Sequence, residues 1–305
     1  MRIALAGTGA AAGDRLVLTW GTTVVAVHAI AAADAGAGMA SIDIAAATLA
    51  ALPDGTRDLV ARVDDVAGNV GATSAAFALT LDRSAPRTTA RITAVTDDAP
   101  LVTGTVASGG LTNDTTPTLT GTVSAALGSD ETVEVLRNGR AVGFAAVSGT
   151  RWSFGDSGLS DATTYAYTVR VVDAAGNRGT ASTSYSIVVD TAPPSRSLVK
   201  ADVVDNVIPD RGSVPNGGST NDTRPELVLT LDSVLASGES LRVHRASGGG
   251  SPVTIGLATR DSGTTYVLTE DRALARGGTY TYSADVVDAA GNPASLGLNY
   301  TIYIV

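Results

Sequence analysis

The feature that most constrains this chain is an internal repeat with a fixed spacing. The segment Asp65–Asn69 recurs as Asp173–Asn177, and a third time as Asp288–Asn292. We call these three segments the DxAGN turns. A second block, Leu81–Pro86, returns as Val189–Pro194 at the offset that separates the first two DxAGN turns. Separate blocks that share one offset indicate several copies of one structural unit.

A third block supports the same offset and fixes the domain boundaries. Thr112–Pro117 matches Thr220–Pro225, again with that offset in residue number. The repeated pattern around Asp82 and Asp190 marks the joints between copies. We therefore predict three tandem domains, over residues 1–82, 83–190 and 191–305.

Within each copy the pattern is that of β-strands. Apolar and polar residues alternate along Tyr165–Val172 and again along Tyr280–Val287, which is typical of half-buried strands. Asn138-Gly139 is a hairpin signal. About seven short strands in each full copy predict an all-β fold of immunoglobulin-like (Greek-key) sandwiches. Leu159 followed by Tyr165 matches a tyrosine corner, and Ala45–Ala51 predicts one helical turn.

The first copy is shorter than the others at its start. Its first strand, Ile3–Thr8, aligns with Thr118–Thr122, which in the second copy comes after a long leading stretch. We expect the first domain to lack its leading strand, and the chain to be a piece of a longer array.

Composition excludes several classes of function. The absence of cysteine excludes disulfide scaffolds, thiol catalysis and Cys-ligated zinc. A net charge of −9 argues against nucleic acid as a partner, because phosphate binding requires clustered positive charge. No run of about 18 apolar residues occurs, so we expect no membrane span in this segment. Aspartate outnumbers glutamate by 25 to 5, which favours turns and sites for hard cations over helices.

The combined motifs resemble the bacterial immunoglobulin-like repeats that build the extender regions of giant biofilm-associated and RTX-type adhesins. The resemblance is carried by Val95–Asp98, Asn113–Gly121, Trp152–Phe154, Asp173–Asn177 and Asp190–Pro193. It implies a type I-secreted, surface-exposed array that is stiffened by calcium and supports adhesion or biofilm formation. Its partners would be neighbouring repeats of a longer chain, with host or surface glycans and proteins bound through other regions. The expected location is extracellular, at the bacterial cell surface.

Two copies depart from this pattern. Arg57 stands in the first copy where the second has Tyr165, and the first copy also carries a long alanine-rich segment, Ala29–Ala51. In the third copy Asn206 replaces the second aspartate of the pair Asp97-Asp98.

The repeats also predict where the aspartates lie. In a seven-strand sandwich the turn between the last two strands lies at the end where the chain enters, so each DxAGN turn should face the preceding joint. Carboxylates brought together there would repel, and Ca²⁺, which takes 6–8 oxygen ligands, would relieve that repulsion. The candidate calcium ligands are Asp82, Asp97, Asp98, Asp114, Asp173, Asn177, Asp190, Asp288 and Asn292. The alternative is that these aspartates only cap turns through nearby backbone amides.

Enzymatic readings of the sequence are weak, and we expect no catalytic activity. The Gly-rich segment Gly7–Gly13 is followed by a strand-like run, so no helix is available for a pyrophosphate. Gly155–Gly158 resembles a serine-protease loop, yet His28 and His244 fall in other copies. Two alternatives to a structural extender remain open: a glycan- or protein-binding module centred on Ala29–Ala51, and a self-assembling surface layer or filament.

Overall fold

The computed structural model describes residues 1–305 as an almost wholly β protein. The chain divides into two compact units. The first unit comprises Met1–Pro86 together with Asp173–Arg178, and the second comprises Arg87–Val172 and Gly179–Val305. The names first, second and third domain are kept for residues 1–82, 83–190 and 191–305.

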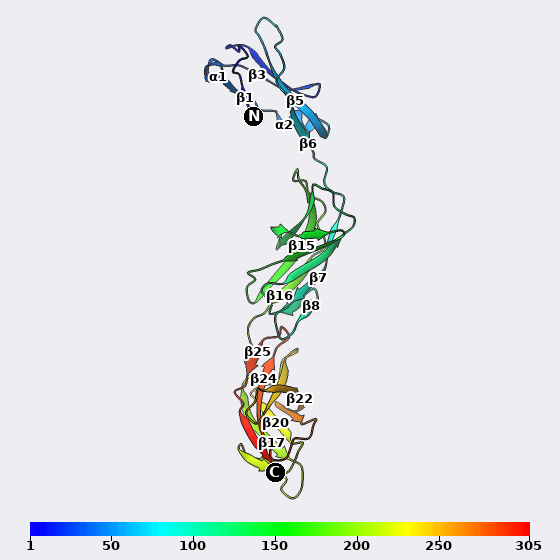
Figure 1. Cartoon of the computed structure of the whole chain (residues 1–305), viewed down its shortest axis with the longest axis vertical. Helices are drawn as coiled ribbons and strands as arrows, with labels where there is room; N and C mark the ends of the chain where they lie inside the picture. The colour runs from blue at the N-terminus through cyan, green and yellow to red at the C-terminus, as the bar shows by residue number, and fades with distance from the viewer. The chain divides into compact units, whose positions relative to one another are not determined.

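The second domain is a sandwich of two five-stranded sheets, with the strand orders β13-β14-β10-β7-β8 and β12-β11-β15-β16-β9 (Figure 1). Its strands are β7 (Ala90–Asp97), β8 (Gly104–Val106), β9 (Gly110–Thr112), β10 (Thr118–Val123), β11 (Glu131–Arg137), β12 (Arg140–Phe144), β13 (Ala146–Ser148), β14 (Arg151–Gly155), β15 (Thr163–Asp173) and β16 (Tyr185–Val189). Inward residues such as Leu119, Trp152 and Tyr167 form the core between the sheets. The predicted immunoglobulin-like sandwich is confirmed.

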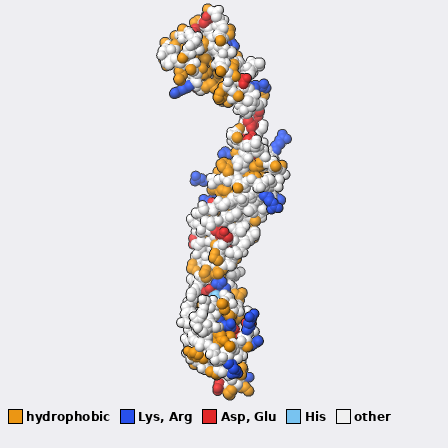
Figure 2. Space-filling model, in the orientation of Figure 1, with side chains coloured by type: hydrophobic (Ala, Val, Ile, Leu, Met, Phe, Trp, Pro, Cys, Tyr) orange, Lys and Arg blue, Asp and Glu red, His pale blue; other side chains and the backbone are white.

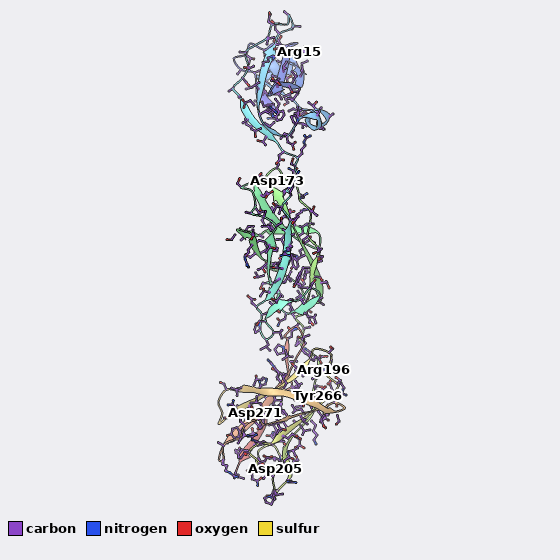
Figure 3. All side chains as sticks on the ribbon, turned by 90° about the vertical axis from the view of Figure 1, so that its right-hand side faces the viewer. Arg15, Asp173, Arg196, Asp205, Tyr266 and Asp271 are labelled. Atoms are coloured by element: carbon purple, nitrogen blue, oxygen red, sulfur yellow. The ribbon has the colours of Figure 1, made fainter.

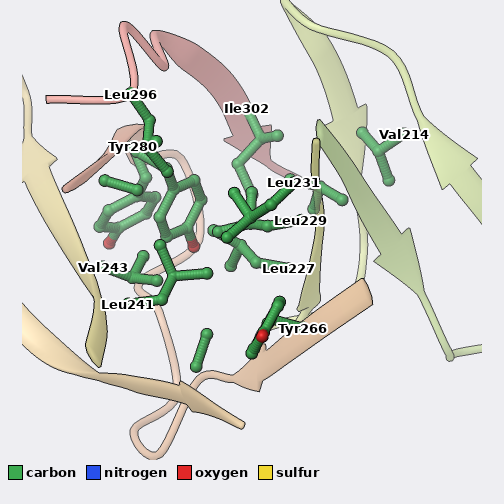
Figure 4. Close-up of a cluster of buried hydrophobic side chains, with 14 of the residues drawn as sticks. Val214, Leu227, Leu229, Leu231, Leu241, Val243, Tyr266, Tyr280, Leu296 and Ile302 are labelled. Carbon is green, nitrogen blue, oxygen red and sulfur yellow. The ribbon is translucent and has the colours of Figure 1, made fainter. Parts of the chain in front are cut away.

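The third domain repeats this plan, with one addition. Its strands are β17 (Leu198–Asp205), β18 (Gly212–Val214), β19 (Gly218–Thr220), β20 (Glu226–Leu231), β21 (Ser240–Ser247), β22 (Val253–Ser262), β23 (Thr265–Thr269), β24 (Thr279–Val287), β25 (Pro293–Ser295) and β26 (Tyr300–Ile304). Strand β22 pairs with β21 in one layer and with β23 in the other, which joins both layers into one ten-stranded sheet. Figure 4 shows the core, where Tyr280, Leu229 and Ile302 pack together.

The first domain is smaller. It consists of β1 (Arg2–Ala4), β2 (Arg15–Trp20), β3 (Thr23–Ala29), α1 (Ala32–Ala37), β4 (Met39–Ser41), α2 (Ala46–Ala51), β5 (Gly55–Asp64) and β6 (Phe77–Leu81). A four-stranded sheet, β3-β2-β5-β6, faces only the two-stranded sheet β1-β4. Helix α2 confirms the helical turn predicted for Ala45–Ala51.

Local sequence accounts for two recurring details. Asn138 and Gly139 have φ values of 51° and 78°, as the tight hairpin between β11 and β12 requires. The predicted tyrosine corner is also present, because the amide of Ser160 donates to the Tyr165 hydroxyl at 2.8 Å. The third domain has the same bond, from the amide of Ala275 to the Tyr280 hydroxyl at 2.8 Å.

Candidate functional site

The DxAGN turn of the second domain lies against the Asp82 joint, where the sequence predicted it. The side-chain amide of Asn177 donates to the backbone carbonyl of Asp82 at 3.2 Å. Asp173 accepts from the backbone amide and the side-chain amide of Asn177, each at 2.9 Å. Figure 3 labels Asp173 at one end of the second domain. Burial raises the pKa of the Asp173 carboxyl, but the hydrogen bonds from Asn177 outweigh it and the pKa is lowered.

The third domain repeats this arrangement at the Asp190 joint. The side-chain amide of Asn292 donates to the backbone carbonyl of Asp190 at 2.8 Å. One oxygen of Asp288 accepts three backbone amides, from Ala290, Gly291 and Asn292, at 2.8–2.9 Å. The same contact between an asparagine and the joint carbonyl therefore occurs at both joints.

In the second domain, the segment before β10 contacts the Asp190 joint at the end of that domain. The amide of Asp190 donates to the carbonyl of Thr112 at 2.9 Å, and the Thr112 hydroxyl donates to buried Asp97 at 2.6 Å. Asp114, also buried, accepts from the amides of Asp98 at 3.3 Å and Thr116 at 2.7 Å. Burial, followed by the charges of Asp114 and Asp98, raises the pKa of Asp97.

The third domain contains the same network at equivalent positions. The Thr220 hydroxyl donates to Asp205 at 2.5 Å, and Asp222 accepts from the amides of Asn206 at 3.0 Å and Arg224 at 2.8 Å. Figure 3 places Asp205 at the end of this domain remote from Arg196. Asn206 stands where the second domain has Asp98. The contact is the same in both domains, because it uses only the backbone amide of this residue.

Each network has one buried oxygen without a hydrogen-bond partner. The Oδ1 atoms of Asn113 and Asn221 are inaccessible to solvent and unpaired. Their Nδ2 atoms donate to the carbonyls of Pro100 at 3.0 Å and Ile208 at 3.1 Å. Because a buried acceptor without a donor is costly, a repeated case indicates an unfilled role for these oxygens.

The predicted ligands are not gathered around one point: the structure has no group of three or more His, Cys, Asp or Glu side chains already arranged around a metal position. Asp173 and Asp288 instead cap their own turns, and Asp82 and Asp190 accept the amides of Ser84 at 3.0 Å and Ala192 at 3.1 Å. The turn-capping alternative describes these four side chains. The reason is that nearby amides satisfy each carboxylate without bringing another carboxylate close.

The oxygen ligands that best suit a cation are therefore those of the network around Asp97 and Asp114. Asp97 and Asp114 are buried, the pKa of Asp97 is raised partly by like charge, and the Asn113 oxygen is orphaned. These are hard oxygen ligands of the kind that Ca²⁺ takes, so this network fits a cation better than the DxAGN turns do. The assignment of calcium ligands stays a prediction.

The sequence analysis missed a buried ionic cluster in each full domain. In the second domain Arg137 and Asp156 form an ion pair at 2.9 Å, and the Tyr167 hydroxyl donates to Asp156 at 2.7 Å. The Gly155–Gly158 loop that resembles a protease nucleophile loop is thus a structural anchor. Burial and the neighbouring Asp156 raise the pKa of Tyr167, which keeps the phenol protonated as a donor.

The third domain builds the same cluster from Arg245, Glu270 and Tyr282. Arg245 pairs with Glu270, and the Tyr282 hydroxyl donates to Glu270 at 2.9 Å. A signal was available in the repeat. Arg245 follows Arg137 at the offset shared by the repeated blocks, and Tyr282 follows Tyr167 at the longer offset between the second and third DxAGN turns.

The helices of the structure are α1 and α2, and no helix is long and apolar enough to cross a membrane.

Comparisons with known proteins agree with the fold. Residues 89–191 match the model of the bacterial Ig-like domain family. Exoglucanase B of Cellulomonas fimi is 31% identical over 247 residues, which cover 79% of this chain and 19% of that protein. The chain thus spans about a fifth of the length of this curated relative.

Two solved structures match the chain at low sequence identity. A putative membrane-anchored protein from Corynebacterium diphtheriae is 11% identical, over 100% of this chain and 86% of that one, with a TM-score of 0.26. An α-L-rhamnosidase from Dictyoglumus thermophilum is 12% identical, over 64% and 28% of the two chains, with a TM-score of 0.24. Scores this low carry no argument about function.

Proposed function

We propose that this chain is a non-catalytic extender segment of a larger secreted or surface-displayed bacterial protein. The observation that carries the proposal is the repeated joint contact, in which Asn177 and Asn292 bind the carbonyls of Asp82 and Asp190. A contact repeated at successive joints gives each domain the same attachment to the one before it. That regularity is what a spacer requires and what a single binding module does not.

We further propose that Ca²⁺ stiffens the Asp190 joint. Asp97, Asp98, Asp114 and the orphaned oxygen of Asn113 would hold the ion, with backbone carbonyls and water completing its 6–8 oxygen ligands. The ion would supply a positive charge that relieves the repulsion raising the pKa of Asp97.

The test is thermal unfolding in millimolar calcium and in EDTA. An ion that binds only the folded chain stabilises it by about 2.7 kcal/mol at 100 times its Kd, and the melting temperature should rise accordingly. Asp114→Asn should abolish the calcium response, whereas Asp210→Asn, an exposed change in the third domain, should retain it. Identical melting curves in calcium and EDTA would contradict calcium stiffening.

The extender role has its own test. Small-angle scattering of the intact chain should report a narrower range of domain separations than that of the double variant Asn177→Ala/Asn292→Ala. Equal distributions would mean that the joint contacts do not restrain the domains. Asn138→Ala, which removes an asparagine that takes part in neither joint contact, serves as the matched control.

The match to part of an exoglucanase favours a second setting for the same spacer role. The larger protein would then be a modular enzyme rather than an adhesin, with its catalytic domain outside residues 1–305. Antibodies raised against this chain would identify the full-length protein in culture fractions. Glucan-degrading activity in the immunoprecipitate would support the enzyme, and bacterial attachment lost on antibody addition would support the adhesin.

A further inference from the structure

Two strands of the first domain, β1 and β6, each have an unpaired edge, whereas the corresponding edges in the other two domains are paired. In the second domain β10 pairs with β7, and β16 pairs with β9. The third domain pairs β20 with β17, and β26 with β19. In the first domain β1 pairs only with β4, and β6 pairs only with β5. We call Ala90–Thr112 and Leu198–Thr220, which supply these partners, the leading segments.

The register of the missing pairing can be read from the second domain. Strands β6 and β16 correspond at the offset of the repeat, and β9 runs parallel to β16 with Gly110 opposite Ile187. Two backbone bonds bracket this pairing: Gly109 donates to Ser186 at 2.7 Å, and Asp190 donates to Thr112 at 2.9 Å.

The third domain shows the same bracket. Gly217 donates to the carbonyl of Thr301 at 2.7 Å, and Val305 donates to that of Thr220 at 2.9 Å. The corresponding groups of the first domain are the carbonyl of Ala78 and the amide of Asp82, with Thr80 between them. These groups face away from β5, on the side where no strand lies.

Between the two free edges lies an apolar groove of about 340 Å³. Ile3 of β1, Leu59 and Ala61 of β5, and Phe77 of β6 line it. Phe77 is 63% exposed. Figure 2 shows hydrophobic side chains gathered on the visible face of this domain.

The residues equivalent to Phe77 in the second and third domains, Tyr185 and Tyr300, show which contact the groove lacks. Tyr185 is half-buried, and its hydroxyl donates to the carbonyl of Val106 at 2.5 Å. Tyr300 donates in the same way to Val214 at 2.5 Å. Both carbonyls belong to leading segments, so in the full domains this ring packs against the strand that the first domain does not contain.

We propose that this groove binds one polypeptide segment with the pattern of a leading segment, supplied from outside residues 1–305. Its first strand would pair antiparallel to β1, as β7 does to β10, and its last strand would pair parallel to β6, between Ala78 and Asp82, as β9 does to β16. The segment would place apolar side chains over Phe77. Buried Val95 and Val106 of the second domain show the chemistry required at its inward positions.

The observations favour this occupant over a second copy of the chain. Both leading segments within residues 1–305 are already paired in their own domains. Self-pairing of β6 about a two-fold axis would be antiparallel, and would leave β1 and the groove uncovered. A separate leading segment, with one strand for each edge, satisfies both edges at once.

The test uses the intact chain and a synthetic peptide of residues 89–112, with amide hydrogen exchange as the readout. The peptide should slow exchange about tenfold in Ala78–Asp82 and Arg2–Ala4 and leave Tyr185–Val189 unchanged, because only unpaired edges can gain protection. A control peptide with V95D and V106D should give no protection.

Variants of β6 locate the effect. Thr80→Pro removes the outward amide of an exposed residue and should abolish the protection, whereas Thr80→Val, which keeps that amide, should retain it. Absence of protection at millimolar peptide, or protection unaffected by Thr80→Pro, would overturn the proposal. Protection that appears without peptide and grows with protein concentration would show that a second copy is the occupant, and would also overturn it.

Discussion

The first and second domains share a turn, but they differ in how completely two sheets cover the core. Asp65 accepts from the amide of Asn69 at 2.8 Å, much as Asp173 does from Asn177 at 2.9 Å. Yet β5 of the first domain is mostly half-buried or exposed, whereas the inward side chains of β15 are fully buried. The difference teaches that the DxAGN turn is a local unit, set by one aspartate, while the core depends on strands far away in sequence.

The leading segment accounts for most of that difference. In the second domain it contributes Ala90, Val95 and Val106 to the buried cluster, and β9 covers the edge of β16. The first domain instead has α2, whose partly buried Leu49 packs against its apolar cluster. A two-stranded sheet cannot cover a four-stranded one, so apolar side chains of the first domain remain exposed.

The largest expected effect concerns the buried ionic cluster, which the first domain does not have. Glu270→Ala should destabilise the third domain by about 3–5 kcal/mol, because half-buried Arg245 and the buried Tyr282 hydroxyl both lose the carboxylate that they share. Denaturant unfolding followed by amide exchange in β24 would measure the loss. The adjacent exposed change Asp271→Ala is the control, and an equal response from both variants would show that the cluster contributes nothing specific.

The next largest difference between the two domains should be the loss of stability caused by a core substitution. Leu119→Ala, at a fully buried position, should cost the second domain about 2–5 kcal/mol. Ile3→Ala, at a half-buried position of the first domain, should cost about 1 kcal/mol, because less apolar surface is lost. Exchange rates of β15 and β5 would report each effect. Similar losses would mean that the first domain is packed as tightly as the second.

The tyrosine corner gives a smaller contrast. Tyr165→Phe removes the hydroxyl that accepts the Ser160 amide, and should cost about 1 kcal/mol. Arg57 occupies that position in the first domain and lies over the ring of Trp20, with 5.4 Å between the guanidinium carbon and the ring centre. Arg57→Lys should therefore change the stability of the first domain by less. Thermal unfolding of the two variants would rank them.

Acid should change the stability of the two domains in opposite directions, and this is the smallest of the expected effects. In the first domain hydrogen bonds from His28, Arg83 and Asn69 lower the pKa of Asp34, Asp54 and Asp65, respectively, below 3.8. Their contribution is present above pH 3.8 and is lost as the pH falls through each lowered pKa.

Asp97 of the second domain behaves in the opposite way. Burial raises its pKa, so its ionisation opposes folding, and protonation as the pH falls through that raised pKa relieves the penalty. Amide exchange of β5 and β7 between pH 6 and pH 3 would compare the domains. Greater acid loss of protection in β7 would contradict this reasoning.

The features that could be predicted from the sequence are those determined by short segments of the chain. The sandwich fold, the hairpin at Asn138, the corner at Tyr165 and the position of the DxAGN turns opposite Asp82 and Asp190 all follow from local pattern and spacing. The calcium ligands stay a prediction, because the sequence places aspartates near the joints without showing which backbone amides each carboxylate accepts. Asp288 alone accepts three backbone amides.

The ionic cluster escaped prediction for a related reason. Asp156 and Glu270 differ in residue type and share neither offset of the repeat, so only three-dimensional packing shows that both meet an arginine and a tyrosine. The bridging role of β22 was also hidden, because nothing local shows that one strand pairs with partners in both layers.

The parallel pairing of β9 with β16, and of β19 with β26, has a consequence under tension. In a chain pulled from its ends, force would enter each full domain through its leading segment, which ends in β9 or β19, and would leave from its last strand, β16 or β26. Because β9 and β16 run in the same direction, as do β19 and β26, pulling would slide the paired strands past each other and load their hydrogen bonds together in shear. The first domain has no such clamp on β6, so under load it would open one bond at a time and act as the compliant element of the chain.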